Sequence, residues 1–114
     1  MRLLLIGALL FGLFGLSAAQ AASFDCTAAK ADDEKAVCAR QELSDLDVRM
    51  ATMYDMTLRL VAMGVADDLR DGQRAFLGSR SACGSNEACI HKAYMARIED
   101  IEAVFNRIAE NGPF

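Results

Sequence analysis

The stretch EACIHKAYMARIEDIEAVFNRIAE, residues 87–110, decides the fold of this chain. Its apolar side chains recur every three or four positions, which is the spacing of residues on one face of an α-helix. The residues on this face are Ile90, Ala93, Tyr94, Ile98, Ile101, Val104, Phe105 and Ile108. The segment Asn111-Gly112-Pro113 follows directly, and these residue types typically end a helix. The pattern predicts a long helix from about Glu87 to Glu110 that buries its apolar face.

Two more long helices are predicted upstream of this stretch. The first starts or resets at Ser44 and is interrupted at Gly64, and its apolar face has the same helical spacing. That face consists of Leu43, Leu46, Met50, Met53, Tyr54, Thr57, Leu58 and Val61. The second spans roughly residues 67–82, although Gly72 and Gly78 each cost up to ~1 kcal/mol of helix propensity. Its inward face is expected to carry Leu69, Gln73, Phe76, Leu77 and Arg80.

A short helix is expected before these three. Asp32 or Asp33 offers an N-cap, Glu34 adds a carboxylate near the positive helix end, and the helix runs to about Arg40. No stretch of the sequence shows the alternating pattern of a β-strand. We therefore predict an all-α protein, a small antiparallel helical bundle with three long helices and one short N-terminal helix.

The first 21 residues have the pattern of a secretory signal peptide. Arg2 is followed by an apolar run at residues 3–16 and by small residues that fit the subsites of a signal peptidase. Cleavage after Ala21 is favoured, with cleavage after Ala19 or Ala22 as alternatives. As a helix the apolar run covers about 21 Å, too short for a hydrocarbon core of about 30 Å. The sequence thus predicts a signal peptide at 1–21 and one helical domain at 22–114.

The mature domain is expected to be periplasmic or secreted, without membrane insertion. No cysteine follows the small residues directly, so a lipid anchor is not expected. The full chain has a formal charge of −4, and loss of Arg2 with the signal peptide changes this to −5. An acidic surface disfavours nucleic acid and anionic lipid as partners and favours a basic protein. The sequence leaves the oligomeric state open.

Four cysteines, Cys26, Cys38, Cys83 and Cys89, are expected to form two disulfides, because export places them in an oxidising compartment. Pairing of neighbours is favoured, since it closes short loops and since residues 84–86, Gly-Ser-Asn, suit a turn. The two crossed pairings stay open as alternatives. Each short bridge is expected to stabilise the fold by about 2–3 kcal/mol.

The residues offer little for catalysis or metal binding, so we expect neither an enzyme nor a cofactor nor a metal site. His91 is the only histidine, and disulfide formation would remove the thiolates that zinc needs. The paired acids Asp32-Asp33, Asp67-Asp68 and Glu99-Asp100 are expected to be solvated side chains near helix starts or on polar faces.

Three methionines, Met50, Met53 and Met56, form a Met-x-x-Met-x-x-Met run. Thioether sulfur suits cuprous copper, so a copper-binding module is one hypothesis for an exported chain. The run lies within an apolar helix face, however, and gap-filling methionines in the core are the favoured interpretation.

Several segments together resemble the LprI-type lysozyme-inhibitor domain over nearly the whole mature chain. The most specific is the run Gln-Arg-x-aromatic-Leu-x-x-Arg-x-x-Cys at residues 73–83, combined with the four cysteines. The other matching segments are Phe24-Asp25-Cys26, Glu34, Ala36-Val37-Cys38, Glu42-Leu43, Leu46-Asp47, Tyr54, Cys89, Tyr94 and Arg97-Ile98. Family members usually carry Trp where this chain has Phe76, and the mycobacterial form is a lipoprotein, unlike this chain.

The resemblance implies an exported protein that binds a lysozyme-like muramidase and inhibits it by occluding the active-site cleft. A chain of negative charge would be steered toward a basic lysozyme. The contacting edge should offer hydroxyl, amide or cationic donors to the two catalytic carboxylates. The loop at residues 80–86 has this make-up, and His91 lies beside it. The candidate partner-binding residues are Arg80, Ser81, Ser85, Asn86 and His91.

A second hypothesis is a periplasmic structural or acid-stress-protective protein without an enzyme target. In that case the helices would expose their apolar faces when carboxylates are protonated. The copper-binding module based on the methionine run is the third hypothesis. Inhibition at neutral pH, protection from aggregation at low pH and binding of cuprous ion distinguish the three.

Overall fold

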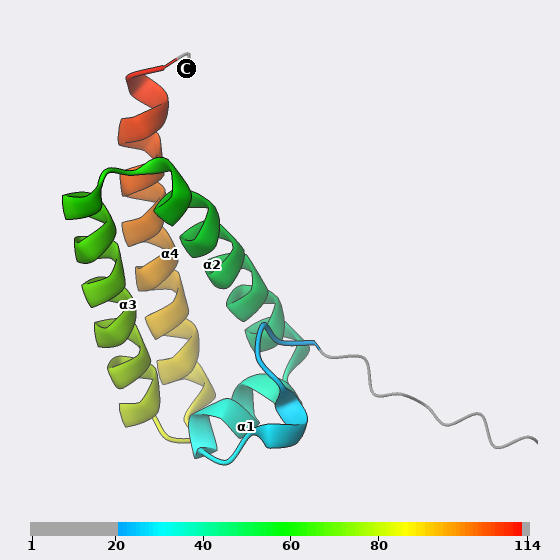
Figure 1. The fold of residues 1–114 in the computed structure, drawn as a ribbon. Helices are drawn as coiled ribbons and strands as arrows, with labels where there is room; N and C mark the ends of the chain where they lie inside the picture. The colour runs from blue at the N-terminus through cyan, green and yellow to red at the C-terminus, as the bar shows by residue number, and fades with distance from the viewer. Residues whose placement is uncertain (1–20, 113–114) are drawn as a thin grey trace, which may run out of the picture.

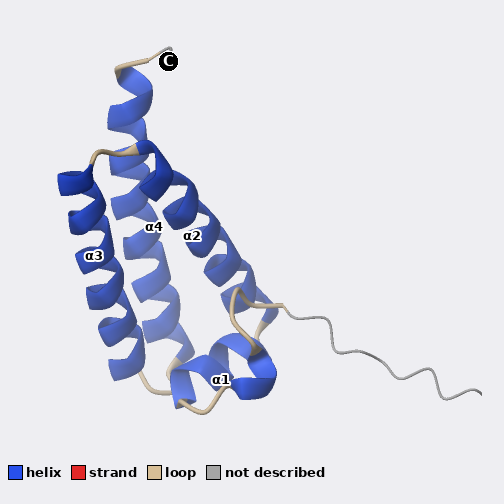
Figure 2. Cartoon of the chain, viewed as in Figure 1, coloured by secondary structure: helices blue, strands red, loops and turns tan. Residues whose placement is uncertain are grey.

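A computed structural model describes residues 21–112 of the chain, and these residues are almost entirely helical (Figure 1). The predicted signal peptide, apart from Ala21, lies outside the described residues. The elements are the 3-10 helix η1 (Cys26–Ala28) and the helices α1 (Asp32–Ala39), α2 (Gln41–Leu60), α3 (Met63–Ala82) and α4 (Glu87–Glu110). Figure 2 shows only helices and loops in the described part of the chain. The predicted all-α class, with three long helices and one short one, is confirmed.

The three long helices alternate in direction, and α1 lies across one end of them (Figure 1). α4 packs against both α2 and α3, and α1 contacts all three long helices. α2 and α3 meet at their short turn and diverge toward α1 (Figure 1). The N-terminal segment, α1 and the α3–α4 loop therefore share one end of the bundle. The α2–α3 turn and the C-terminal end of α4 form the other end.

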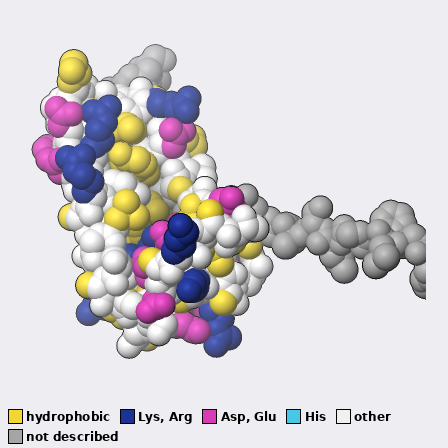
Figure 3. All heavy atoms as spheres, turned by 60° about the horizontal axis from the view of Figure 1, so that its bottom comes forward, with side chains coloured by type: hydrophobic (Ala, Val, Ile, Leu, Met, Phe, Trp, Pro, Cys, Tyr) yellow, Lys and Arg dark blue, Asp and Glu magenta, His cyan; other side chains and the backbone are white. Residues whose placement is uncertain are grey.

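The core is built from the inward helix faces. The buried apolar residues are Ala22, Val37, Leu43, Met50, Ala66, Leu69, Phe76, Ile90, Tyr94, Ile98 and Ile101. The rings of Phe76 and Tyr94 pack in a tilted arrangement with centroids 5.1 Å apart. Figure 3 shows that some apolar side chains also remain visible at the surface, in a band flanked by charged side chains.

Two residues of the predicted apolar faces are exposed. Phe105 is 41% exposed, whereas its α4 neighbours Val104 and Ile108 line a groove beside the α2–α3 turn. Leu77 is 43% exposed on the side where α2 and α3 diverge. Both residues lie in helices as predicted, but no neighbouring element covers most of either side chain.

Two helix starts also differ from the predicted ones. α2 begins at Gln41, and Ser44 is buried inside it, where its hydroxyl donates to the backbone carbonyl of Val37 at 2.7 Å. α3 begins at Met63, so Gly64 lies in its first turn and does not interrupt the chain. The interruption is made instead by two extended residues between the helices, which have no turn-forming side chains that would mark them in the sequence.

Both disulfides join neighbouring cysteines, which confirms the favoured pairing. Cys26–Cys38 connects η1 to α1 with a Cα–Cα distance of 5.8 Å, and Cys83–Cys89 closes the α3–α4 loop with 5.6 Å. Two disulfides in a chain of this size indicate an oxidising, extracellular setting. None of the helices within residues 21–112 has the length and apolar character needed to cross a membrane.

Candidate functional site

The loop between α3 and α4 is constrained by its disulfide and by local hydrogen bonds. Gly84 has a φ of +57°, a left-handed conformation that favours glycine. The Oδ1 atom of Asn86 accepts a hydrogen bond from the backbone amide of Cys89 at 3.0 Å and so caps α4. The backbone amide of Asn86 donates to the carbonyl of Cys83 at 3.1 Å. A loop held in this way loses little conformational entropy when it binds a partner.

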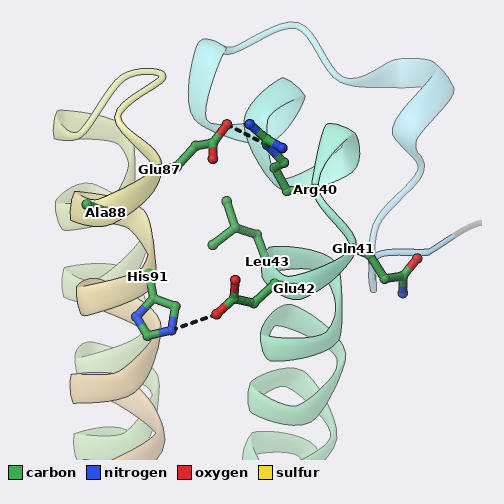
Figure 4. Close-up of a pocket in the computed structure, with 7 residues that line it drawn as sticks. All are labelled: Arg40, Gln41, Glu42, Leu43, Glu87, Ala88 and His91. Carbon is green, nitrogen blue, oxygen red and sulfur yellow. Dashed lines mark hydrogen bonds and ion pairs between the residues drawn. The ribbon is translucent and has the colours of Figure 1, made fainter.

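A cleft of about 610 Å³ lies beside this loop, between the first turns of α2 and α4 (Figure 4). Two polar contacts between side chains cross it. Arg40 Nε donates to Glu87 Oε1 at 2.7 Å, and His91 Nε2 lies 3.3 Å from Glu42 Oε1. The buried Leu43 lies between these two contacts (Figure 4). The hydrogen bond and charge of Glu87 raise the pKa of Arg40, so Arg40 stays charged at any physiological pH.

Four of the five predicted partner-binding residues lie at this end of the bundle and are accessible. Ser81, Ser85 and Asn86 are exposed, and the side chain of His91 is 43% exposed. We call these four residues the loop edge. Arg80 is only 6% exposed, and its guanidinium is bonded inside the bundle. The prediction that Arg80 contacts a partner is therefore corrected.

Arg80 belongs instead to a buried polar network that joins all four α-helices. Its Nε donates to Asp33 Oδ2 at 2.7 Å, and its Nη1 donates to Tyr94 Oη at 3.0 Å. The Tyr94 hydroxyl in turn donates to Asp47 Oδ1 at 2.9 Å. All four residues are at most 6% exposed. Because each partner comes from a different helix, the network favours one relative arrangement of the four helices.

Burial and charge set the protonation states within this network. Burial lowers the pKa of Arg80, but its hydrogen bonds and charge interactions, led by the hydrogen bond with Asp33, raise it by more. Burial raises the pKa of Tyr94 well above its ordinary value, and the charge of Asp47 adds to this effect. At physiological pH, Arg80 is therefore charged, and Tyr94 is neutral, so its hydroxyl donates a hydrogen bond to Asp47.

We expect the stability difference between the wild-type chain and Tyr94→Phe to be constant below about pH 10 and to shrink above it. Since the folded-state pKa of Tyr94 is raised, its contribution is fully present below the unfolded pKa of about 10. It is lost as the pH rises toward the folded-state value, by up to about 1.4 kcal/mol per pH unit. Urea unfolding of both proteins between about pH 8 and pH 11.5 measures this difference. A difference that stays constant throughout would contradict the buried neutral state.

The N-terminal segment closes one side of the network. The backbone amide of Ser23 donates to Asp47 Oδ2 at 2.6 Å. The Arg80 guanidinium carbon lies 5.4 Å from the ring centroid of Phe24, a distance at which cation–π attraction acts. The Cys26–Cys38 disulfide ties this segment to α1. The first disulfide therefore supports the buried network as well as the chain end.

The two carboxylates of the network, Asp33 and Asp47, were not predicted to be buried, and the prediction that Asp33 is a solvated side chain is wrong. Asp33 does not cap α1, since Ala31 holds the N-cap position without a side-chain bond and the Asp33 carboxylate faces inward. Asp47 lies four residues after Leu43 and three before Met50, within the apolar face of α2. This position is a signal in the sequence for a buried polar contact, because a carboxylate on a buried helix face needs a hydrogen-bond or ionic partner.

A second buried group surrounds Arg97 on α4. Its Nε donates to Gln73 Oε1 at 3.0 Å, and its Nη2 donates to the backbone carbonyl of Leu69 at 2.8 Å. A Cβ atom added at Gly72 would lie 2.5 Å from Arg97 Nη1. The absence of a side chain at Gly72 thus lets the guanidinium approach α3. At Gly78, an added Cβ would meet nothing within 4 Å.

We therefore expect opposite results from the same substitution at these two glycines. Gly78→Ala is expected to raise the free energy of unfolding by about 0.5–1 kcal/mol, because alanine favours the helix. Gly72→Ala is expected to lower it by about 1 kcal/mol or more, because Arg97 must give up buried hydrogen bonds. Thermal and urea unfolding of the two variants test this. An equal increase in the free energy of unfolding in both variants would contradict this prediction, because Arg97 would then move aside at no cost in stability.

The methionine run does not form one cluster. Met50 is buried, and its Sδ accepts a hydrogen bond from Gln73 Nε2 at 3.4 Å, whereas Met53 is half-buried and Met56 is 55% exposed. The three thioethers therefore extend from the core to the surface. Within residues 21–112, no three His, Cys, Asp or Glu side chains are grouped so that they could hold a metal ion.

The loop edge and the neighbouring cleft offer hydroxyl, amide and imidazole groups on a constrained backbone. These groups suit reversible contact with a protein surface. Comparisons of the chain with protein-family models, with curated proteins and with solved structures found no match in any of the three.

Proposed function

We propose that this chain is an exported protein that binds a lysozyme-like muramidase and inhibits it by placing the loop edge in the active-site cleft. The observation that carries the proposal is the constrained, accessible loop closed by Cys83–Cys89. The resemblance of the residues to the LprI-type lysozyme-inhibitor domain supports it. The disulfides support export, because they form in an oxidising compartment. Export would bring the chain to the cell wall, where a muramidase acts.

The chemistry of the loop edge fits a cleft with two catalytic carboxylates. Asn86 uses its Oδ1 to cap α4 and keeps its amide nitrogen for donation to a partner. Ser85 adds an exposed hydroxyl, and His91 adds a half-exposed imidazole. Two acids lie beside the loop edge: Glu87 is paired with Arg40, and Glu42 lies 3.3 Å from His91 Nε2. The edge thus presents hydrogen-bond donors to carboxylates, and the charge of Glu87 is compensated by Arg40.

The charge of the rest of the domain supports the choice of a basic target. The mature chain carries a formal charge of −5, which steers it toward a basic protein over distances of about one Debye length. Steering of this kind raises the association rate at low salt. It does not by itself block catalysis, so contact at the loop edge is required as well.

A cell-wall lysis assay tests the proposal. Oxidised residues 22–114 are added to hen-type and goose-type lysozymes at neutral pH, and the clearing of a cell-wall suspension is followed. We expect the lysis rate of at least one lysozyme class to approach zero near one molar equivalent and to recover in part at high salt. Full lysis in the presence of a tenfold molar excess would contradict the proposal.

A parallel aggregation assay addresses the acid-stress-protective alternative. A denatured client protein is acidified with and without residues 22–114, and light scattering is recorded. If scattering is suppressed only at low pH and lysozyme keeps its full activity, the acid-stress function replaces the inhibitor function. Cuprous-ion binding that is lost in a Met50, Met53 and Met56 triple substitution would favour the copper module.

A further inference from the structure

The end of the bundle opposite the loop edge is apolar. We call it the turn end and define it as residues 55–66 and 103–112, the α2–α3 turn with the C-terminal part of α4. Of the eight exposed large apolar residues in the described chain, five lie here. They are Met56, Leu60, Met63, Val65 and Phe105, and Met63 is 83% exposed. Apolar side chains concentrated in this way mark an interaction surface.

A groove runs along the turn end. Its volume is about 410 Å³, and it lies between the α2–α3 turn and the last turns of α4. The apolar residues that line it are Leu60, Val61, Ala62, Val65, Val104 and Ile108. Arg107 is the one charged residue among its lining. α4 extends past the turn (Figure 1), so one surface contains both a groove and a projecting helix end.

The charges of the turn end favour a second copy of the chain as its occupant. Asp55, Arg59, Arg107 and Glu110 give this region a formal charge of zero, whereas the mature chain carries −5. Two copies therefore meet here without the repulsion that opposes contact elsewhere. A basic protein or an anionic lipid surface would find no net attraction at this end.

The sequence of α4 provides a matching pair of charges for a two-fold arrangement. Arg107 and Glu110 are three residues apart, so they lie on one side of the helix. In an antiparallel contact between two α4 ends, each Arg107 faces the Glu110 of the other copy. A two-fold contact uses the same surface on both copies. The Arg107–Glu110 pair suits such a contact, because the positive residue of each copy meets the negative residue of the other.

We propose that two copies of this chain associate through their turn ends, each projecting α4 end lying in the groove of the other. The loop edges then face away from each other at the two far ends of the dimer. One helix of 20 residues is about 30 Å long, so neither loop edge is covered by the contact. The dimer thus presents two identical binding edges, and its formation does not depend on what those edges bind.

Sedimentation velocity of oxidised residues 22–114 tests the association. We expect the average mass to rise from one chain to two between about 5 and 500 µM. Phe105→Glu is expected to weaken association at least tenfold, because it places a charge in the apolar contact. Met95→Glu is the matched control, since Met95 is 43% exposed on the same helix but outside the turn end. It is expected to change the dissociation constant less than twofold.

A charge exchange tests the two-fold arrangement itself. Arg107→Glu is expected to weaken association about tenfold, since like charges then meet across the contact. Adding Glu110→Arg to it restores the pair and is expected to bring the dissociation constant within threefold of wild type. Circular dichroism confirms that each variant is folded. A single-chain mass up to 500 µM, or equal weakening by Phe105→Glu and Met95→Glu, would overturn the proposal.

Discussion

Arg80→Met is expected to lower the free energy of unfolding by about 3–5 kcal/mol, because it leaves buried carboxylates without their cation. Asp33 loses its 2.7 Å hydrogen bond from Arg80 Nε. Asp47 loses its ionic contact with Arg80 Nη1, which lies 3.8 Å from its Oδ1 atom. Methionine keeps much of the arginine volume, so the effect reports the lost charge more than a new cavity. Urea unfolding followed by circular dichroism at 222 nm measures it.

Arg49→Met is the matched control for this substitution. Arg49 Nη2 also pairs with a carboxylate on another helix, Glu102 Oε1 at 2.6 Å, but both side chains are about half exposed to solvent. An ion pair of this kind contributes about 0.2–1 kcal/mol. If Arg80→Met lowers the free energy of unfolding no more than Arg49→Met does, the buried network does not stabilise the arrangement of the helices.

Replacing Cys26 and Cys38 together by serine is expected to lower the free energy of unfolding by about 3 kcal/mol. The bridge joins residues 12 apart in sequence, and a loop of this length restricts the unfolded chain by about that amount. The variant also frees the N-terminal segment, in which Ser23 donates to Asp47 and Phe24 lies against Arg80. For a domain of this size the loss is a large part of the total stability.

The Cys83 and Cys89 pair provides the control for the first bridge. Its residues are only six apart, so their replacement by serine is expected to cost somewhat less, about 2.4 kcal/mol. Amide hydrogen exchange separates the two variants. The Ser23 amide is expected to lose protection only when the first bridge is removed. A cost below 1 kcal/mol for the first bridge, with Ser23 still protected, would contradict its proposed role.

Local signals in the sequence were sufficient for most of the fold. α4 begins and ends at the predicted residues, because Asn86 caps its first turn and an Asn-Gly-Pro segment follows its last. The neighbour pairing of the cysteines follows from short loops in the same way. The predicted start of α3, residue 67, was wrong by four residues, because α3 begins at Met63. The two extended residues before Met63 are of types that also occur within helices, so they do not mark the helix start.

The candidate site was predicted only in part, because burial depends on partners that are distant in the sequence. Asp33 and Arg80 are 47 residues apart, and so are Asp47 and Tyr94. The helical spacing places Arg80 on the inward face of α3, but it does not show that the carboxylate of Asp33 on α1 points inward and pairs with it. Ser85 and Asn86 of the loop edge were easier to identify, since their exposure follows from their place in the short α3–α4 turn, and Ser81 and His91 lie on the helices that flank it.

Two variants that add the same charge test whether the loop edge occupies the active-site cleft of a muramidase. Asn86→Asp keeps a side chain that caps α4 equally well but replaces an amide donor by a carboxylate at the loop edge. Thr52→Asp adds the same charge at an exposed position of α2, with similar helix propensity.

The measurement is the inhibition constant of each variant against the muramidase that the wild-type chain inhibits. We predict at least about a tenfold increase for Asn86→Asp, because the new carboxylate would face the catalytic carboxylates, and less than twofold for Thr52→Asp. Equal inhibition constants for the two variants would contradict the claim that the loop edge occupies the cleft.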